Sequence, residues 1–144
     1  MSFKADLAFG KWYEKKLIEI IPSDSHIIKD GKFLPYDLEL TKGDITSKYE
    51  VKADRMTIKT GNVAIEYECY DKPSGITTSE ADYYAYFVIK NNANVFDLYL
   101  IPTATIKELI AQKKYKRSIL GGDLNKSRMY LFDIIHFRDY LHKK

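Results

Sequence analysis

The sequence has little cysteine: Cys69 is the single one among 144 residues. One cysteine excludes a disulfide within the chain and any zinc site built from several cysteines. No apolar run approaches the length of a membrane-spanning helix, and residues 1–16 carry no continuous apolar segment of signal-peptide length. We therefore predict a cytoplasmic protein that is not exported and has no membrane partner.

Glycine and proline are also sparse, with seven and four residues, and no repeat, low-complexity segment or interdomain linker interrupts the chain. Hydrophobic residues make up 45% of the sequence and aromatic residues 14%, including 12 tyrosines. Disordered chains lack large apolar groups of this kind. The composition predicts one folded domain covering residues 1–144.

The net charge is only +3, but basic residues gather in the last third of the chain. The run KKYKR supplies Lys113, Lys114, Lys116 and Arg117. Such clusters fit contact with a phosphate backbone and are also common on ordinary solvated surfaces. On their own they favour a nucleic-acid partner only weakly.

Hydrophobic periodicity predicts an α/β fold in which a mixed sheet is flanked by helices. The expected helices cover residues 4–21, 80–90 and 103–116, with a short helix at the end of the chain. The expected strands cover residues 26–29, 34–41, 45–59, 63–70, 94–102 and 129–135. The TGN turn at 60–62 indicates that the strands on either side of it form a hairpin.

One strand carries an unusual charged face. In the stretch YEVKAD, Glu50 and Lys52 share one side, and Asp37 precedes them at a spacing that suits an adjacent antiparallel strand. Two neighbouring carboxylates repel each other, so one takes up a proton unless a cation lies between them. Hard divalent ions such as Mg²⁺ supply that charge and bind oxygen ligands.

Lys52 emerges beside Glu50, where it could reach an attacking water or a phosphate oxygen. Two acidic ligands, a lysine and a hard metal are the equipment for phosphodiester hydrolysis. The Glu-x-Lys pattern alone is weak, because any strand with a solvated face produces it by chance. Asp37 at a suitable spacing and a carboxylate, Glu14, on the otherwise apolar side of the first helix make the site interpretation stronger.

The pattern Asp37 to Glu50-Val51-Lys52 resembles the PD-(D/E)XK nuclease superfamily, which includes type II restriction enzymes and phage and archaeal Holliday-junction resolvases. The resemblance implies that Asp37 and Glu50 bind Mg²⁺, with Mn²⁺ as a substitute, helped by the carbonyl of Val51. It implies that Lys52 orients or activates the water. One departure is that Tyr36 separates Pro35 from Asp37.

The resemblance extends over about two thirds of the chain. Resolvase-like members carry a glutamate on the first helix, and GKWYEKKLIEII matches that layout at Glu14. The segment TGNVAIEYECYDKPSGITTSEADYYAYF resembles phage-type members and contains Ser74 and Gly75. The implied fold is restriction-endonuclease-like, with an αβββαβ core and one added hairpin strand at 63–70. If the chain is phage-encoded, the expected location is the host cytoplasm.

The function implied first is a Holliday-junction resolvase, an endonuclease that hydrolyses phosphodiester bonds in four-way DNA junctions. A junction has two-fold symmetry, so such an enzyme is expected to be a homodimer. Basic residues near the end of the chain would then hold the DNA backbone. The alternatives are a restriction or repair endonuclease acting on duplex or flap DNA, and a non-catalytic DNA-binding subunit with the same fold.

Several residues keep two interpretations. Glu66 either extends the acidic cluster or pairs with a basic residue on the preceding strand, such as Arg55 or Lys59. Ser74 and Gly75 either let a phosphate approach the backbone closely or form a simple loop. The aromatic cluster within residues 83–87 is interpreted as helix packing or a dimer surface.

Overall fold

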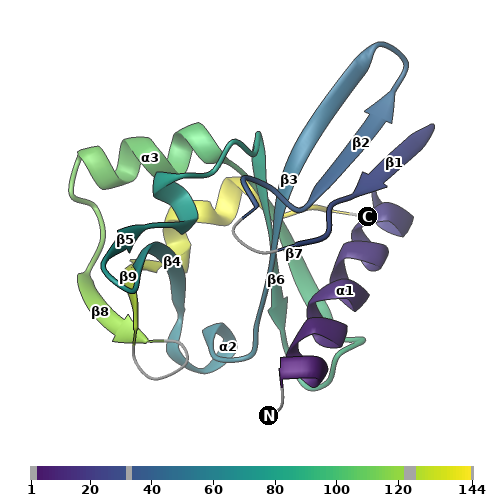
Figure 1. Ribbon diagram of the computed structural model, residues 1–144. Coiled ribbons are helices and arrows are strands. Elements are labelled where there is room, and N and C mark those ends of the chain that lie inside the picture. The colour runs from purple at the N-terminus through teal and green to yellow at the C-terminus, as the bar shows by residue number, and fades with distance from the viewer. Residues whose placement is uncertain (1–2, 32–33, 122–125, 144) are drawn as a thin grey trace.

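The computed structural model describes residues 3–31, 34–121 and 126–143 (Figure 1). Its α-helices are α1 (Phe3–Ile20), α2 (Thr57–Thr60) and α3 (Thr103–Ala111), and its 3₁₀ helices include η1 (Gly75–Thr77) and η3 (Ile134–Tyr140). Its strands are β1 (Ser25–Ile28), β2 (Leu38–Lys42), β3 (Ile45–Asp54), β4 (Asn62–Cys69), β5 (Lys72–Pro73), β6 (Tyr83–Ile89), β7 (Phe96–Pro102), β8 (Arg117–Gly121) and β9 (Ser127–Asp133). None of the helices in these described ranges is long and apolar enough to cross a membrane.

The first sheet is mixed. Within the described residues it has five strands in the order β1-β2-β3-β6-β7. The strands β1, β2 and β3 form an antiparallel meander, β3 then pairs in parallel with β6, and β6 pairs antiparallel with β7. Because the chain leaves the sheet after β3 and returns at β6, the whole second layer of the protein is inserted between these two strands.

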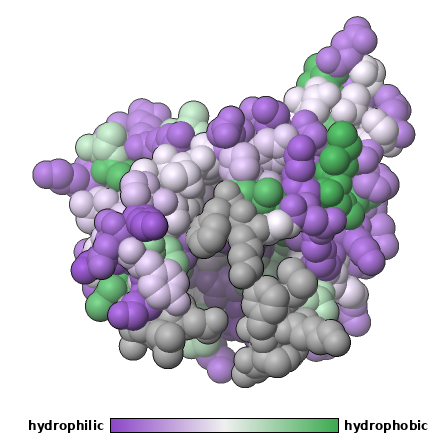
Figure 2. Space-filling model, viewed as in Figure 1, coloured by the Kyte–Doolittle hydropathy of each residue, from purple (hydrophilic) through white to green (hydrophobic). Residues whose placement is uncertain are grey.

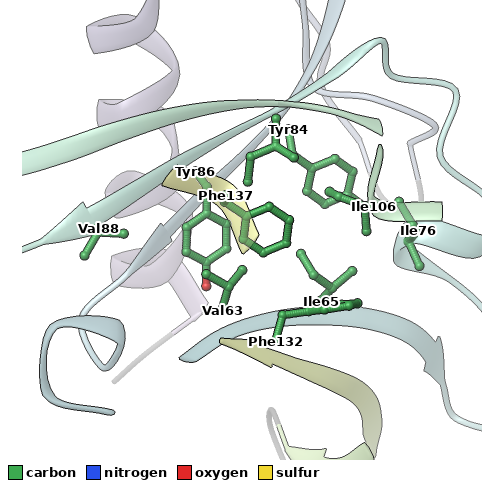
Figure 3. Close-up of a cluster of buried hydrophobic side chains, with 10 residues drawn as sticks. Val63, Ile65, Ile76, Tyr84, Tyr86, Val88, Ile106, Phe132 and Phe137 are labelled. Carbon is green, nitrogen blue, oxygen red and sulfur yellow. The ribbon is translucent and has the colours of Figure 1, made fainter. Parts of the chain in front are cut away.

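The central strand β6 is buried on both faces, which is why its sequence, YYAYFVI, is a continuous apolar run. Its odd-numbered residues, including Phe87, face α1 and join a core with Tyr13, Leu17 and Leu38. Its even-numbered residues, including Tyr84, face the other way and form the cluster in Figure 3. The sheet therefore separates two hydrophobic cores.

The second layer is an antiparallel sheet in the order β5-β4-β9-β8. Figure 1 shows α3 on the same side of the first sheet as this layer, opposite α1. The cluster in Figure 3 joins Val63 and Ile65 of β4, Phe132 of β9, Ile106 of α3 and Phe137 of η3 to the first sheet. The helices and the second sheet thus cover both faces of the mixed sheet.

The predicted fold class, α/β with a mixed sheet flanked by helices, is confirmed. The opening order of one helix followed by three strands is confirmed as well, and so are the strands expected at 94–102 and 129–135 and the helix that begins at Thr103. The final helix is the 3₁₀ helix η3. The second strand is shorter than expected, because it begins at Leu38 instead of at residue 34.

The helix expected over residues 80–90 is wrong: this segment is β6. Its apolar residues fit a helical stripe as well as they fit a strand buried on both sides, and periodicity alone does not separate the two. Aromatic and β-branched residues, which pack well on a pleated sheet, favour the strand. The interpretation of the aromatic cluster as helix packing falls with it.

The expected hairpin of strands 45–59 and 63–70 is also wrong. The first strand ends at Asp54, the one-turn helix α2 follows, and Gly61 at its end has a φ of 73°. The chain then enters the second sheet, where β4 pairs with β5 and β9. The Glu68 carboxylate accordingly lies 2.9 Å from Arg128 of β9.

The strands β1, β2 and β3 extend beyond the body of the molecule as an arm (Figure 1). Its tip carries Ile45, which is 71% exposed, and its edge carries Ile27. Figure 2 shows apolar residues in green among hydrophilic ones on this arm.

Asp54 is expected to stabilise the junction between the two layers. Its Oδ1 accepts from the N–H groups of Met56 and Thr57, at 2.6 and 3.1 Å, and its Oδ2 accepts from the hydroxyl of buried Tyr86. Asp54→Ala should lower the free energy of unfolding by on the order of 2 kcal/mol, since it removes the acceptor of two backbone N–H groups at the start of α2 and leaves a buried hydroxyl without its acceptor. Urea denaturation measures the loss.

A double-mutant cycle with Tyr86→Phe provides the control. Once the Tyr86 hydroxyl is gone, removing its acceptor costs less. The double variant should therefore lose less unfolding free energy than the sum of the two single losses. Strictly additive losses would show that the two side chains do not act as a pair.

Candidate active site

A cleft of about 340 Å³ opens where β2 begins beside β3. Its floor comes from β3 and β4, and the loop around η1 forms one wall. The described residues that line it are Gly31, Leu34, Pro35, Asp37, Glu50, Lys52, Glu66, Pro73, Ser74, Gly75, Thr78 and Ser79. Asp37, Glu50 and Lys52 thus converge on one space, together with Ser74 and Gly75.

Asp37 lies at the start of β2, and its backbone holds it against both neighbouring strands. Its N–H donates to the Tyr49 carbonyl at 2.9 Å, and its own carbonyl accepts from the Lys29 N–H at 2.9 Å. The side chain continues the contact with β3, because Oδ2 accepts from the Val51 N–H at 2.8 Å. This bond fixes the carboxylate in place and leaves Oδ1 available to a ligand.

The Val51 carbonyl points to the same side of β3 as the Val51 N–H, since both groups of a strand residue face the same neighbour. On that side β2 does not extend beyond its first residue, Leu38, and the Asp37 carboxylate accepts from the Val51 N–H in place of a backbone carbonyl. The side chain of Val51 packs toward α1 on the other face of the sheet. The carbonyl oxygen of Val51 is therefore directed toward the Asp37 end of the cleft.

Glu50 contributes a largely buried carboxyl group to the cleft, with a side chain only 13% exposed. Its Oε1 lies 3.5 Å from the Nζ of Lys52. Its Oε2 is buried and makes no hydrogen bond to any described residue. Burial raises the pKa of Glu50 to about 8; the Lys52 ammonium opposes this shift and the Asp37 carboxylate adds to it.

Lys52 lies on the same face of β3 and is 43% exposed, so its ammonium remains within reach of a bound molecule. Burial lowers its pKa, but the carboxylates of Glu50, Asp37 and Glu66 outweigh that effect, and the net pKa is raised. Lys52 is therefore a cation at neutral pH. A charged lysine can donate to a phosphate oxygen or to a water but cannot accept a proton from it.

Glu14 approaches Asp37 from α1. The residue is 9% exposed, its Oε1 makes no hydrogen bond within the described ranges, and the nearest cation, Lys11, is 3.6 Å away. Burial and the Asp37 carboxylate raise the pKa of Glu14 to about 7. Glu14 does not line the cleft itself, so it contributes to the charge around Asp37 from behind.

The backbone around position 75 requires a glycine there. Its φ is +53°, and a Cβ there would lie 2.1 Å from the Glu66 carbonyl oxygen. Ser74 Oγ donates to Glu66 Oε2 at 3.1 Å. The Ser74 N–H also donates to the Tyr67 carbonyl at 3.1 Å, so Ser74 fastens the loop to β4, and the close approach that demands glycine at position 75 is made by the backbone of β4. Glu66, whose role the sequence left open, lines the cleft and does not pair with Arg55 or Lys59 in the described structure.

The basic residues Lys113, Lys114, Lys116 and Arg117 are exposed but do not line the cleft. They lie between α3 and β8, at the far left of Figure 1. The Nζ of Lys116 is 2.6 Å from Asn62 Oδ1 and 3.7 Å from Asp133 Oδ2. The structure therefore separates this basic cluster from the carboxyl groups of the cleft.

Tyr84 is a site residue that the sequence did not reveal. It pairs with Glu50 in the parallel register of β3 and β6, it is 1% exposed, and its hydroxyl has no hydrogen-bond partner among the described residues. Burial and the Glu50 carboxylate raise its pKa. Interpreting 83–89 as a strand would have placed Tyr84 beside Glu50.

The cleft residues fit a hard cation only in part. No group of three or more His, Cys, Asp or Glu side chains in the described ranges is arranged closely enough to hold a metal ion. The buried, unpartnered Oε2 of Glu50 and the oriented Asp37 carboxylate are nevertheless the oxygen ligands that Mg²⁺ prefers. With the Val51 carbonyl they would offer oxygen ligands only, the kind that Mg²⁺ and Mn²⁺ prefer.

No family model matches the sequence, and no curated protein matches it. Among solved structures, the bacterial homing endonuclease I-Ssp6803I is similar over 90% of this chain and 78% of its own, with a TM-score of 0.49 and 18% sequence identity. A similarity of this size carries no argument about function. Membership of the PD-(D/E)XK superfamily therefore stays a prediction.

The raised pKa of Glu50 predicts a pH-dependent stability. A carboxyl group whose pKa rises on folding stabilises the protein fully below its unfolded value of about 4.5, and this stabilisation is lost as pH rises through about 8. In EDTA, the Glu50→Gln variant should therefore lose less unfolding free energy than wild type between pH 5 and pH 9, by on the order of 1 to 3 kcal/mol. Denaturant titrations at a series of pH values measure this difference.

Glu39→Gln is the matched control, because Glu39 lies on β2 two residues beyond Asp37 and does not line the cleft. This variant should follow the wild-type pH dependence. Equal pH dependence in all three proteins would contradict the raised pKa of Glu50.

A second prediction concerns Gly75. Gly75→Ala should cost on the order of 2 to 4 kcal/mol of unfolding free energy, because the added Cβ meets the Glu66 carbonyl and the backbone is left-handed. Gly10→Ala should instead be neutral or stabilise by up to about 1 kcal/mol, since Gly10 is helical and a Cβ meets nothing within 4 Å. Thermal unfolding of both variants checks the pair, and a Gly75→Ala protein as stable as wild type would refute the close approach.

Proposed function

We propose that this protein is a Mg²⁺-dependent DNA endonuclease. The observation that carries the proposal is the convergence of Asp37, Glu50 and Lys52 on one cleft, with Glu50 Oε2 buried and unpartnered among the described residues. Among the described residues that line this space, Asp37, Glu50 and Glu66 carry carboxyl groups and Lys52 carries an ammonium. Burial raises the pKa of Glu50 to about 8, so a cation held there would favour its charged form and would allow a phosphate to approach the carboxylates.

The chain's own residues divide the work. Asp37 Oδ1, Glu50 Oε2 and the Val51 carbonyl would hold the metal, and the Val51 N–H keeps the Asp37 carboxylate oriented. Bound there, Mg²⁺ would make a water more acidic and stabilise negative charge on the phosphate. Lys52, as a cation, would donate to the attacking water or to a phosphate oxygen. Glu14 would add negative charge behind Asp37 and so favour the metal.

For the substrate we propose four-way DNA junctions, cut by a homodimer. The support is the resemblance of the Glu14 helix motif to junction-resolving nucleases and of the segment around Ser74 and Gly75 to phage-type members of the same superfamily. Two active sites related by two-fold symmetry would make paired cuts in a two-fold symmetric substrate.

A gel assay tests the proposal. The substrates are a four-way junction, a linear duplex, a flap and a single strand, each with Mg²⁺ and with EDTA. Wild type should cut in Mg²⁺ and not in EDTA. Asp37→Ala, Glu50→Ala and Lys52→Ala should each reduce the cleavage rate by at least about a hundredfold, because each removes a metal ligand or the charge beside the phosphate.

The matched control is Glu39→Ala, a neighbouring carboxylate of β2 outside the cleft, which should cut like wild type. Symmetric nicking of the junction alone would support the resolvase, and cutting of duplex or flap would indicate a general nuclease. Cleavage by Glu50→Ala at the wild-type rate would show that the assigned site is wrong.

A further inference from the structure

A second hollow, of about 360 Å³, lies on the second layer of the protein. We call it the tyrosine groove. It runs between α3 and the inner face of the sheet formed by β4 and β9, which lie together at the left of Figure 1. Its described lining residues are Tyr67, Ile76, Thr77, Lys107, Ile110 and Tyr130.

The aromatic side of the groove is a stack of tyrosines. The rings of Tyr67 and Tyr130 are stacked with centroids 4.2 Å apart, and Tyr115 extends the stack at 4.3 Å from Tyr130. All three residues are only partly buried. The Tyr67 hydroxyl contacts Ser118 Oγ at 2.7 Å, which fixes its ring. Tyr130 lies between the other two rings, which cover both of its faces, so the ring face left for a ligand is that of Tyr67, which lines the groove.

Positive charge surrounds this surface. Lys107 lines the groove, and Lys113, Lys114 and Arg117 flank Tyr115 in the chain; none of the four forms an ion pair with a described residue. The acidic residue Glu68 of β4 is already neutralised by Arg128. Exposed aromatic rings bordered by free cations are the combination with which proteins bind single-stranded nucleic acid.

The groove and the cleft share a wall. Ser74, Gly75 and Thr78 face the cleft, while Ile76 and Thr77, within the same loop, face the groove. Thr77 Oγ1 donates to the Tyr67 carbonyl at 2.8 Å, so the loop is fastened to the tyrosine side too. A strand leaving the cleft over this short loop would pass directly onto the tyrosine groove.

We propose that the tyrosine groove binds an unpaired base of the DNA strand whose phosphate lies in the cleft. This inference rests on the proposed nuclease function and extends it to substrate selection. Bases inside a duplex are stacked and cannot enter a groove, whereas bases beside a junction, flap or nick can. The basic run, which the sequence linked to DNA and the structure separates from the cleft, would hold the phosphates of this strand.

The test compares a blunt duplex with the same duplex carrying a three-nucleotide unpaired tail. Binding is measured by fluorescence anisotropy at fixed salt in EDTA, so that no cleavage occurs. Tyr67→Leu should weaken binding of the tailed duplex about tenfold, in keeping with the usual contribution of one stacked base. Tyr130→Leu should weaken it in the same direction, because it removes the ring that supports Tyr67. Both variants should change blunt-duplex binding less than twofold. Tyr67→Phe and Tyr130→Phe keep the rings and should bind like wild type.

A 2-aminopurine in the tail reports stacking directly. Its fluorescence should be quenched by wild type and by the Phe variants and not by the Leu variants, while melting curves show that each variant is folded. Equal binding of both duplexes by all variants overturns the inference. A change in oligomeric state of the Leu variants, measured by light scattering with DNA binding unchanged, overturns it too, because the groove would then hold a second copy of the chain.

The two proposals fail in different ways. A wild-type protein that prefers the tailed duplex through its tyrosines but cuts nothing with Mg²⁺ supports the groove and refutes the nuclease. A protein that cuts DNA but shows no tyrosine-dependent preference refutes only the groove.

Discussion

The parallel pairing of β3 with β6 is the contact on which the rest of the structure depends. It places β6 in the middle of the mixed sheet, where its two faces supply both hydrophobic cores. The same register sets Glu50 beside Tyr84 and Lys52 beside Tyr86, so buried aromatic rings lie next to the charged side chains. Because Glu50 is largely shielded from water, its charge and those of its neighbours act on one another more strongly than they would on an open surface.

The burial of these carboxyl groups destabilises the metal-free protein. Glu50 and Glu14 are buried carboxylates with raised pKa values, which means that folding disfavours their charged forms. Apolar residues at these positions would remove that cost. A cation held at the cleft would offset it, and the same cation would allow a phosphate to approach. The feature that weakens the fold is thus the feature that the proposed chemistry needs.

Sequence reasoning reached the cleft because local rules govern its main residues. The alternation of β3 and the spacing back to Asp37 suffice to put three side chains together on adjacent strands. It failed at Tyr84, because YYAYFVI is apolar throughout and its periodicity does not distinguish a helix from a strand buried on both faces. It also misplaced β4, since a turn at Gly61 predicts a hairpin from local chemistry while the actual partner, β9, lies far along the chain. Pairing between strands so far apart in the chain cannot be predicted from a short stretch of sequence.

The structure shows a role for the loop around η1 that its composition alone could not predict. Gly75 and Ser74 were candidates for contact with a phosphate, yet their closest contacts are with Glu66 of β4, and Thr77 ties the next turn to Tyr67 on the same strand. Hydrogen bonds from Ser74 and Thr77 to this strand hold the loop as a fixed partition between an acidic cleft and a basic, aromatic groove. Because the partition is fixed, a strand of DNA that crosses it must bend to fit the protein, and unpaired DNA bends at less cost than a duplex. Selection for a distorted substrate would then follow from the rigidity of this loop, without any base-specific contact.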